Sequence, residues 1–115
     1  PTDLRIEAFS LRDALLAYRD GAEVVSSTLA LGLGSTLAHD RLTAAVVHDG
    51  FDAGTARRGA TTVLHYVLGF VWHEQQRMLY DSVGARDMEA SGLESDDFAF
   101  GLDLIAAGLR ARGRV

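Results

Sequence analysis

Four histidines, His39, His48, His65 and His73, are the side chains of this sequence best suited to hold a metal ion. Imidazole is a common ligand of zinc and of neighbouring transition metals. His65 and His73 would lie about 80° apart around a helix, and the sequence has no His-x-x-x-His or Glu-x-x-His pair. We therefore predict no metal site and no cofactor. His39 and His48 are better explained as solvated or capping groups and His65 as a structural side chain.

Other reactive groups are too scattered to form a catalytic site. The chain has no cysteine, and Ser26, Ser27 and Thr28 have neither a histidine at catalytic spacing nor a Gly-x-Ser-x-Gly motif. Gly32 and Gly34 do not belong to a phosphate-binding glycine motif. These observations indicate that the chain is not an enzyme.

Glu7 has two interpretations. If it pointed inward among apolar neighbours, its carboxylate could anchor a cationic ligand, but an unpaired buried carboxylate is costly, so outward solvation is simpler. The sequence leaves both open.

The composition is that of one globular domain. The chain has 115 residues, of which 48% are hydrophobic and 23% are charged. Its net charge of −5 argues against DNA binding by this chain alone. The longest apolar stretch, 63–72, is much shorter than the ~20 residues that span a membrane, and no signal peptide is evident, so we expect a cytoplasmic location without membrane contact. Because position 1 is proline, we expect that the chain begins inside a longer product.

Hydrophobic periodicity predicts an all-α fold. We expect helices over 3–18, with Thr2 or Asp3 as the cap, and from a cap at Ser35 or Thr36 to the stop signal His48-Asp49-Gly50. A short turn or two is expected over 22–27, followed by an apolar loop over 29–34. The longest helix is predicted over 53–80 with Asp52 as its cap. The last is predicted over 96–112, after a loop at 82–94 and with a cap at Ser95–Asp97 that puts two acids in its first turn.

The last two helices are apolar on more than one side, which in a short chain is most economically explained by a second copy. Each of these two helices carries two apolar stripes. One stripe from each helix supplies the residues expected at a dimer interface: Val63, Val67, Phe70, Phe98, Leu102, Ile105 and Leu109. A second pair comprises Leu64, Leu68, Val71, Gln75, Met78, Phe100, Leu104, Ala107 and Ala111. The sequence leaves open which stripe of each helix faces the partner.

Three segments resemble the tetracycline-repressor family, in the family's order. Residues 11–22 are similar to the segment that opens its regulatory core, residues 50–76 resemble its long central helix, and residues 98–105 resemble its terminal dimerisation helix. The resemblance implies a single regulatory domain over 1–115, homodimeric through a four-helix bundle. It also implies a small-molecule pocket and a preceding helix-turn-helix head that releases operator DNA when ligand binds. A structural dimerisation module without a ligand is the alternative.

The resemblance also indicates what kind of ligand to expect. Val25 stands where the tetracycline-binding branch has a metal-ligating histidine, and His73 stands where it has a glutamate that supports the metal. Glu7 and Leu11 replace an Asn and a Phe that grip the drug, whereas Thr28 matches. We therefore expect a more apolar ligand than magnesium-tetracycline. The pocket should open to the first, third and long helices, with these candidate lining residues: Glu7, Leu11, Val25, Thr28, Leu42, Val46, Thr61, Leu64, His65 and His73.

Overall fold

The first helix, α1 (Thr2–Leu16), begins at a cap that comes from elsewhere in the chain. In this computed structural model, which describes residues 2–18, 21–22, 37–81 and 89–112, the Asp49 carboxylate accepts hydrogen bonds from the backbone N–H groups of Asp3 (3.3 Å) and Leu4 (3.1 Å). These N–H groups have no partner within the helix, and the dipole at this end favours a negative charge. The predicted local cap at Thr2 or Asp3 was therefore wrong, because both residues lie inside the helix.

Helix α3 (Leu37–His48) ends at the predicted stop signal, which contains Gly50. Gly50 has φ 106°, a conformation that costs glycine little, and its N–H donates to the Val47 carbonyl at 3.0 Å. The Phe51 N–H reaches back to the Val46 carbonyl at 3.3 Å, which completes a Schellman motif. Both Val46 and Phe51 are buried in the core, so this turn also fixes the direction in which the chain enters the next helix.

The long helix α4 (Ala53–Asp81) begins at the predicted cap. Asp52 accepts hydrogen bonds from the Thr55 backbone N–H at 2.7 Å and from the Thr55 hydroxyl at 3.2 Å. These two bonds, in this order, are the main causes that lower the pKa of the exposed Asp52 carboxyl, which keeps the cap charged.

The last helix, α5 (Glu89–Ala111), begins earlier than the sequence analysis expected. The predicted cap at Ser95–Asp97 was wrong, because these residues lie inside the helix. Glu89, Ala90, Leu93 and Glu94 all favour helix, and Gly92, which suggested a loop, costs a helix only about 1 kcal/mol relative to alanine. Expectations for residues 23–36 and 82–88 lie outside the described residues.

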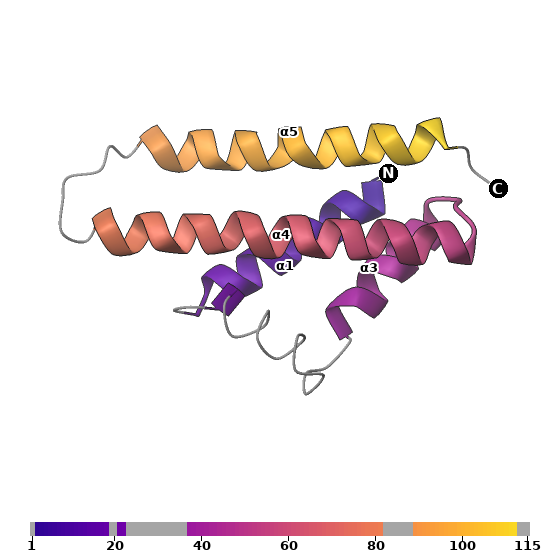
Figure 1. The fold of residues 1–115 in the computed structure, drawn as a ribbon, viewed down its shortest axis with the longest axis horizontal. Coiled ribbons are helices and arrows are strands. Elements are labelled where there is room, and N and C mark those ends of the chain that lie inside the picture. Colours follow the sequence, from indigo (N-terminus) through magenta and orange to yellow (C-terminus); the bar gives the residue numbers. More distant parts are fainter. Residues whose placement is uncertain (1, 19–20, 23–36, 82–88, 113–115) are drawn as a thin grey trace.

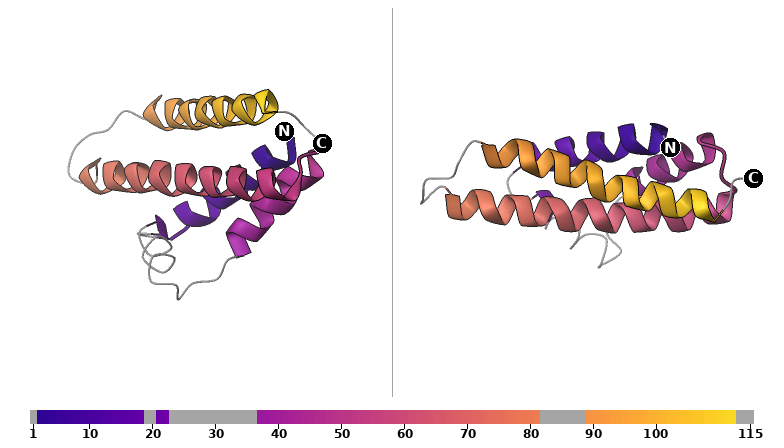
Figure 2. Two further views of the ribbon diagram at one scale, coloured as in Figure 1. Left: turned by 45° about the vertical axis from the view of Figure 1, so that its right-hand side comes forward. Right: turned by 90° about the horizontal axis from the view of Figure 1, so that it is seen from above.

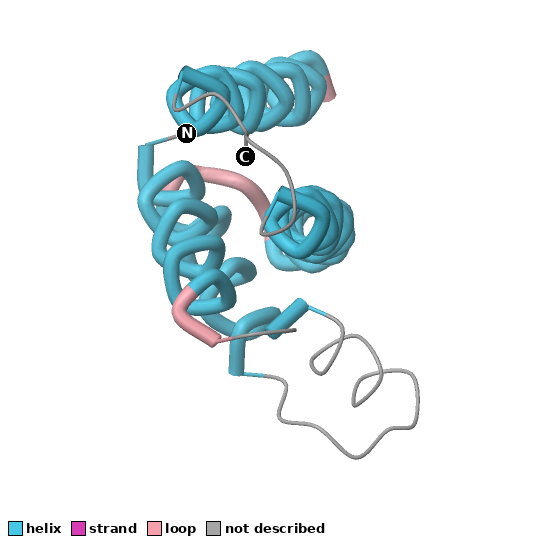
Figure 3. Tube along the Cα trace, turned by 90° about the vertical axis from the view of Figure 1, so that its left-hand side faces the viewer, coloured by secondary structure: helices cyan, strands magenta, loops and turns pink. Residues whose placement is uncertain are grey.

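The helices form a flat assembly with principal extents of 50 × 33 × 16 Å. Helices α4 and α5 run antiparallel, side by side, while α1 and α3 cross α4 (Figure 1; Figure 2). Viewed nearly along the long helices, α5 lies at one edge of the assembly, and α1 and α3 cover one side of α4 (Figure 3). The all-α fold is confirmed, and no described helix is long and apolar enough to cross a membrane.

Side chains from all four helices meet in one hydrophobic core. The first stripe of α4 is buried at Ala56, Ala60, Val63 and Val67, and its second stripe at Leu64, Leu68 and Val71. Both stripes are covered by this chain itself, because α1 and α3 pack on one side of α4 and α5 on another. One copy therefore covers the two-sided apolar pattern along most of α4.

Candidate functional site

An apolar hollow between α1 and α3 contains three of the predicted ligand residues. Its volume is about 180 Å³, and Glu7, Leu11 and Leu42 contribute to its wall. The remaining lining comes from the same two helices: Ser10, Ala14, Leu37, Ala38 and Arg41. The structure thus brings together the resemblance-derived positions of the first helix and a core position of α3, and gives them a mostly apolar surface.

The Glu7–Arg41 ion pair separates this hollow from a second one. Arg41 Nη2 donates to Glu7 Oε1 at 3.3 Å, with 26% of the Glu7 side chain and 60% of the Arg41 side chain exposed. The second hollow, of about 370 Å³, lies between α1 and α3 on the other side of the pair and is lined by Asp3, Ile6, Ala44, Ala45 and His48 as well as by the pair itself. We call the two hollows together the α1/α3 groove. A partly exposed ion pair of this kind contributes little to stability, about 0–1 kcal/mol.

The other predicted ligand residues lie apart from the groove. Val46 and Leu64 are buried in the core, and His65 and His73 are exposed on α4. The interpretation of His65 as a structural core histidine was wrong, because it lies on a face of α4 that no other described helix covers. Val25 and Thr28 lie outside the described residues.

Thr61 is engaged by another side chain of the protein. Its hydroxyl donates to the Arg57 carbonyl at 3.0 Å, so it accepts from His39 Nε2 at 2.9 Å. This contact joins α3 to α4, and His39 is therefore neither a free solvated side chain nor a helix cap.

A buried ion pair that the sequence analysis did not single out joins α1 to α4. Arg12 Nε and Nη2 donate to the two carboxylate oxygens of Glu74, each at 2.8 Å. Only 8% of the Arg12 side chain and 2% of the Glu74 side chain are exposed. Arg12 Nη1 also donates to the Ser95 hydroxyl at 3.3 Å, which adds α5 to the network. Helical periodicity gives no signal for such a pair, because a charged residue in a helix is normally predicted to face solvent.

Two aromatic rings, Phe70 and Phe98, face the Arg12 guanidinium, and a cluster of four rings built around Phe98 holds α5 on the other helices. The guanidinium lies 5.2 Å from the Phe98 ring centroid, and Phe98 packs edge to face against Phe9 (5.0 Å) and Phe70 (5.1 Å). Tyr66 stacks on Phe98 at 5.4 Å with an interplanar angle of 9°. Arg12 thus replaces its hydration shell with a carboxylate, a hydroxyl and aromatic faces.

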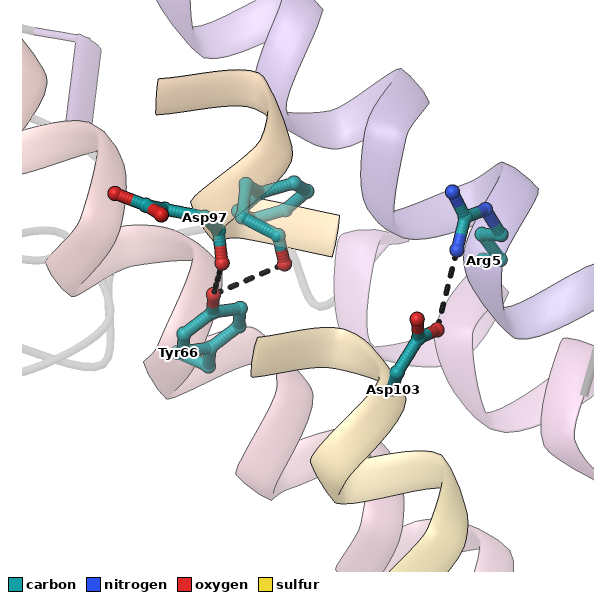
Figure 4. A network of polar contacts seen from close by, with 5 residues as sticks. Arg5, Tyr66, Asp97 and Asp103 are labelled. Atoms are coloured by element: carbon teal, nitrogen blue, oxygen red, sulfur yellow. Dashed lines mark hydrogen bonds and ion pairs between the residues drawn. The ribbon is translucent and has the colours of Figure 1, made fainter. Parts of the chain in front are cut away.

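Tyr66 binds the backbone of α5 and requires a glycine there. Its hydroxyl donates to the carbonyls of Phe98 (3.0 Å) and Asp97 (3.3 Å), as Figure 4 shows. Burial, and then the negative charge of Asp97, raise the pKa of the Tyr66 hydroxyl. A Cβ atom at Gly101 would overlap the Tyr66 hydroxyl, so glycine permits this close approach. Nearby, Arg5 of α1 pairs with Asp103 of α5 at 3.1 Å on the surface (Figure 4).

Gln75, placed by the sequence analysis on an apolar stripe, closes the end of α1 instead. Its amide nitrogen donates to the carbonyls of Leu15 (3.2 Å) and Tyr18 (2.8 Å), and its amide oxygen accepts from the Ala22 N–H at 3.2 Å. Helix C-termini leave carbonyl groups without intrahelical partners, and the Gln75 amide supplies hydrogen-bond donors to them.

A cluster of Asp3, His48 and Asp49 brings three possible metal ligands close together at the start of α1. Asp49 is already occupied as the cap of α1, and His48 contacts the Asp3 carboxylate. Each group therefore has a structural partner in this arrangement. With 81% of its side chain exposed, His48 is the solvated group that the sequence led us to expect.

A third hollow, of about 640 Å³, lies between the start of α4 and the end of α5 and has a mixed polar and apolar lining. Asp52, Arg57, Arg58 and Arg112 contribute charged groups to it, and Thr55 and Thr62 contribute hydroxyls. None of the predicted ligand residues lines it.

Five of the seven residues predicted at the dimer interface are covered by their own chain. Val63, Val67 and Phe98 are completely buried within one chain, and Leu102 and Leu109 are buried as well. Phe70 and Ile105 are partly buried and pack against the same core. Side chains covered by their own chain offer no surface to a second copy. The alternative stripe of α5 remains outside, with Phe100 66% and Leu104 61% exposed.

Comparisons with known proteins assign this architecture to a family. The model of the "Tetracyclin repressor-like, C-terminal domain" family matches residues 2–91. The crystal structure of Mycobacterium smegmatis BioQ has 36% sequence identity and a TM-score of 0.74, and the match covers 92% of this chain and 56% of that one. A second BioQ crystal structure has 36% identity and a TM-score of 0.70, over 89% of this chain and 56% of the other. No curated protein sequence matches the chain.

This chain therefore spans little more than half the length of the BioQ structures that it matches. The family model and both structures agree with the resemblance seen in the three sequence segments. The chain belongs to the tetracycline-repressor-like C-terminal domain family.

Proposed function

We propose that this domain senses a small molecule and dimerises, and that ligand binding in the complete protein releases operator DNA through a helix-turn-helix head. The observation that carries the sensing part is the α1/α3 groove, whose wall contains Glu7, Leu11 and Leu42. The two family-derived positions, Glu7 and Leu11, are one helical turn apart on α1 and face this hollow together. A regulator of transcription of this kind would act in the cytoplasm, as a sensor rather than as an enzyme.

The shape and chemistry of the groove favour an apolar ligand with few polar anchors. Small-molecule sites are mostly apolar concavities with a few convergent polar groups, typically of about 300–1,000 Å³. The apolar hollow of 180 Å³ accommodates part of such a molecule, and the adjoining hollow of 370 Å³ gives it room to extend past the Glu7–Arg41 pair. Because the Glu7–Arg41 pair is partly exposed and held by one contact, a polar group of the ligand could take the place of either side chain in it.

A switch requires that the ligand prefer one state of the protein. To change the populations of two states from 1:99 to 99:1, it must bind the favoured state about 10⁴-fold more tightly. The groove is suited to this role, because a molecule between α1 and α3 would change how α1 lies on the rest of the domain. The Arg12–Glu74 pair would then transmit a displacement of α1 to α4.

Thermal unfolding with a library of apolar and amphipathic compounds tests the sensing function. We expect one chemical class to raise the unfolding temperature, because a ligand at 100 times its dissociation constant stabilises the folded state by about 2.7 kcal/mol. Ala14→Trp should abolish that shift, since Ala14 is exposed and lines the apolar hollow.

The matched control is Ala53→Trp, an equally exposed alanine at the start of α4 that lines neither hollow. Equal loss of the shift in both variants would argue against the groove as the site. A dimer indifferent to every compound would instead favour the alternative, a structural dimerisation module.

A further inference from the structure

The third hollow, between the start of α4 and the end of α5, gathers an excess of positive charge. Three arginines line it, Arg57 and Arg58 from α4 and Arg112 from α5, and all three residues are exposed. Figure 1 shows these two helix ends side by side at one end of the molecule. Because the whole chain has a net charge of −5, the third hollow is a local positive site on an acidic domain.

The positive charge of the third hollow is not balanced by the protein itself. None of its three arginines takes part in an ion pair within the described part of the chain, whereas Arg5, Arg12 and Arg41 each pair with a carboxylate. Asp52, the one acidic group among the described residues of the lining, already accepts hydrogen bonds from the Thr55 N–H at 2.7 Å and from the Thr55 hydroxyl at 3.2 Å. Three positive charges therefore stand against one negative charge that is already engaged.

The rest of the lining supplies apolar surface and hydrogen-bond acceptors. Leu109 is buried, and a Cβ atom at Gly59 would lie 3.0 Å from Leu109 Cδ2, so glycine lets this side chain approach the α4 backbone closely. The hydroxyls of Thr55 and Thr62 donate their hydrogens within the protein, to a carboxylate and to a backbone carbonyl. Both hydroxyl oxygens can still accept a hydrogen bond. The third hollow thus combines arginine donors with threonine acceptors and an apolar wall.

We propose that the third hollow binds a small molecule that bears a phosphate group. A phosphate presents its oxygens in a tetrahedral arrangement and accepts from several guanidinium groups at once, whereas the two oxygens of a carboxylate match the fork of a single arginine. The volume of about 640 Å³ is typical of small-molecule sites and exceeds what a phosphate group fills, so the organic part of the ligand would lie against Leu109. A DNA duplex is too broad to enter a hollow of this size, and the net charge of −5 repels it.

This site is separate from the α1/α3 groove. No residue lines both, and the groove favours an apolar molecule, whereas the third hollow favours an anion. The inference therefore goes beyond the proposed function and does not depend on it.

Isothermal titration calorimetry of the 115-residue chain with inorganic pyrophosphate, at constant ionic strength, tests the proposal. Arg58→Gln and Arg112→Gln should each weaken binding at least about tenfold, because each removes a charged hydrogen-bond donor from the hollow. Circular dichroism verifies that the helices remain. Arg110→Gln makes the same exchange at an exposed arginine of α5 outside the hollow, so this matched control should leave the dissociation constant unchanged.

Two further comparisons define the chemistry and the place of binding. Citrate carries a similar charge on carboxylates alone and should bind at least about tenfold more weakly than pyrophosphate, since its oxygens suit single arginines. Ala14→Trp, which alters the α1/α3 groove, should bind pyrophosphate as tightly as the unmodified chain.

The other outcomes each contradict a part of the proposal. Equal weakening by Arg110→Gln and Arg58→Gln would show that overall charge, rather than the third hollow, attracts the anion. Citrate binding as tight as that of pyrophosphate would overturn the phosphate assignment, and displacement of pyrophosphate by a DNA duplex would assign these arginines to nucleic acid. No measurable binding at millimolar pyrophosphate would overturn the site itself, and would leave ligand sensing by the α1/α3 groove intact.

Discussion

Glu74→Ala is expected to destabilise the domain by about 3–5 kcal/mol, because it leaves the guanidinium of Arg12 buried without its carboxylate. Both side chains are almost completely covered, and both bonds measure 2.8 Å, so neither partner can turn to water without opening the contact between α1 and α4. Domains of this size are typically stable by only about 5–15 kcal/mol. Urea unfolding followed by circular dichroism measures the change.

Two further variants separate loss of the pair from general damage. Arg12→Met/Glu74→Met removes both charges and keeps apolar volume, so it should be less destabilising than Glu74→Ala, since no buried charge remains unpaired. Arg41→Ala breaks an ion pair that is mostly exposed and should cost about 0–1 kcal/mol. If Glu74→Ala were no more costly than Arg41→Ala, the buried pair would not be the link between α1 and α4.

Phe98→Ala is the second substitution with a large expected effect, a loss of about 3–5 kcal/mol. The ring is completely buried and contacts Phe9, Tyr66 and Phe70 as well as the Arg12 guanidinium. Removing it opens a cavity at the point where α5 joins the other helices, and the surrounding rings can collapse into that space only partly. Equilibrium unfolding in urea gives the free energy directly.

Tyr18→Ala provides the control for Phe98→Ala. Tyr18 is aromatic too, but 72% of it is exposed, and its structural hydrogen bonds come from the backbone. Its loss should change the unfolding free energy by about 0.5 kcal/mol or less. Similar effects of the two substitutions would show that Phe98 does not anchor α5.

The sequence predicted the elements whose signals are local. The Asp52 cap, the stop at Gly50 and the two apolar stripes of α4 all follow from short-range rules, and the structure confirms each of them. The start of α5 was missed because Ser95–Asp97 looks like a cap, although a helix already in progress can contain such residues. Packing against α4 determines where α5 begins, and no local sequence pattern indicates that packing.

The contacts between distant residues could not be predicted from local patterns. Asp49 caps α1 through the N–H group of Asp3, 46 residues earlier, and Gln75 closes the end of that same helix from α4. Most of the predicted dimer residues are covered by their own chain, which the sequence could not show. A helix with two apolar sides has the same pattern whether its own chain or a second copy covers it. Only the arrangement of α1, α3 and α5 around α4 shows which stripe stays outside.

The mass of the chain in solution tests the account's central claim, the proposal that this domain dimerises. Sedimentation equilibrium at micromolar concentration should give about 24.8 kDa, twice the 12.4 kDa of one chain, and Leu104→Asp should return it toward the monomer mass. A stable species of 12.4 kDa across that range, with unchanged helix content, would contradict the account, because Phe100 and Leu104 would then remain exposed to water.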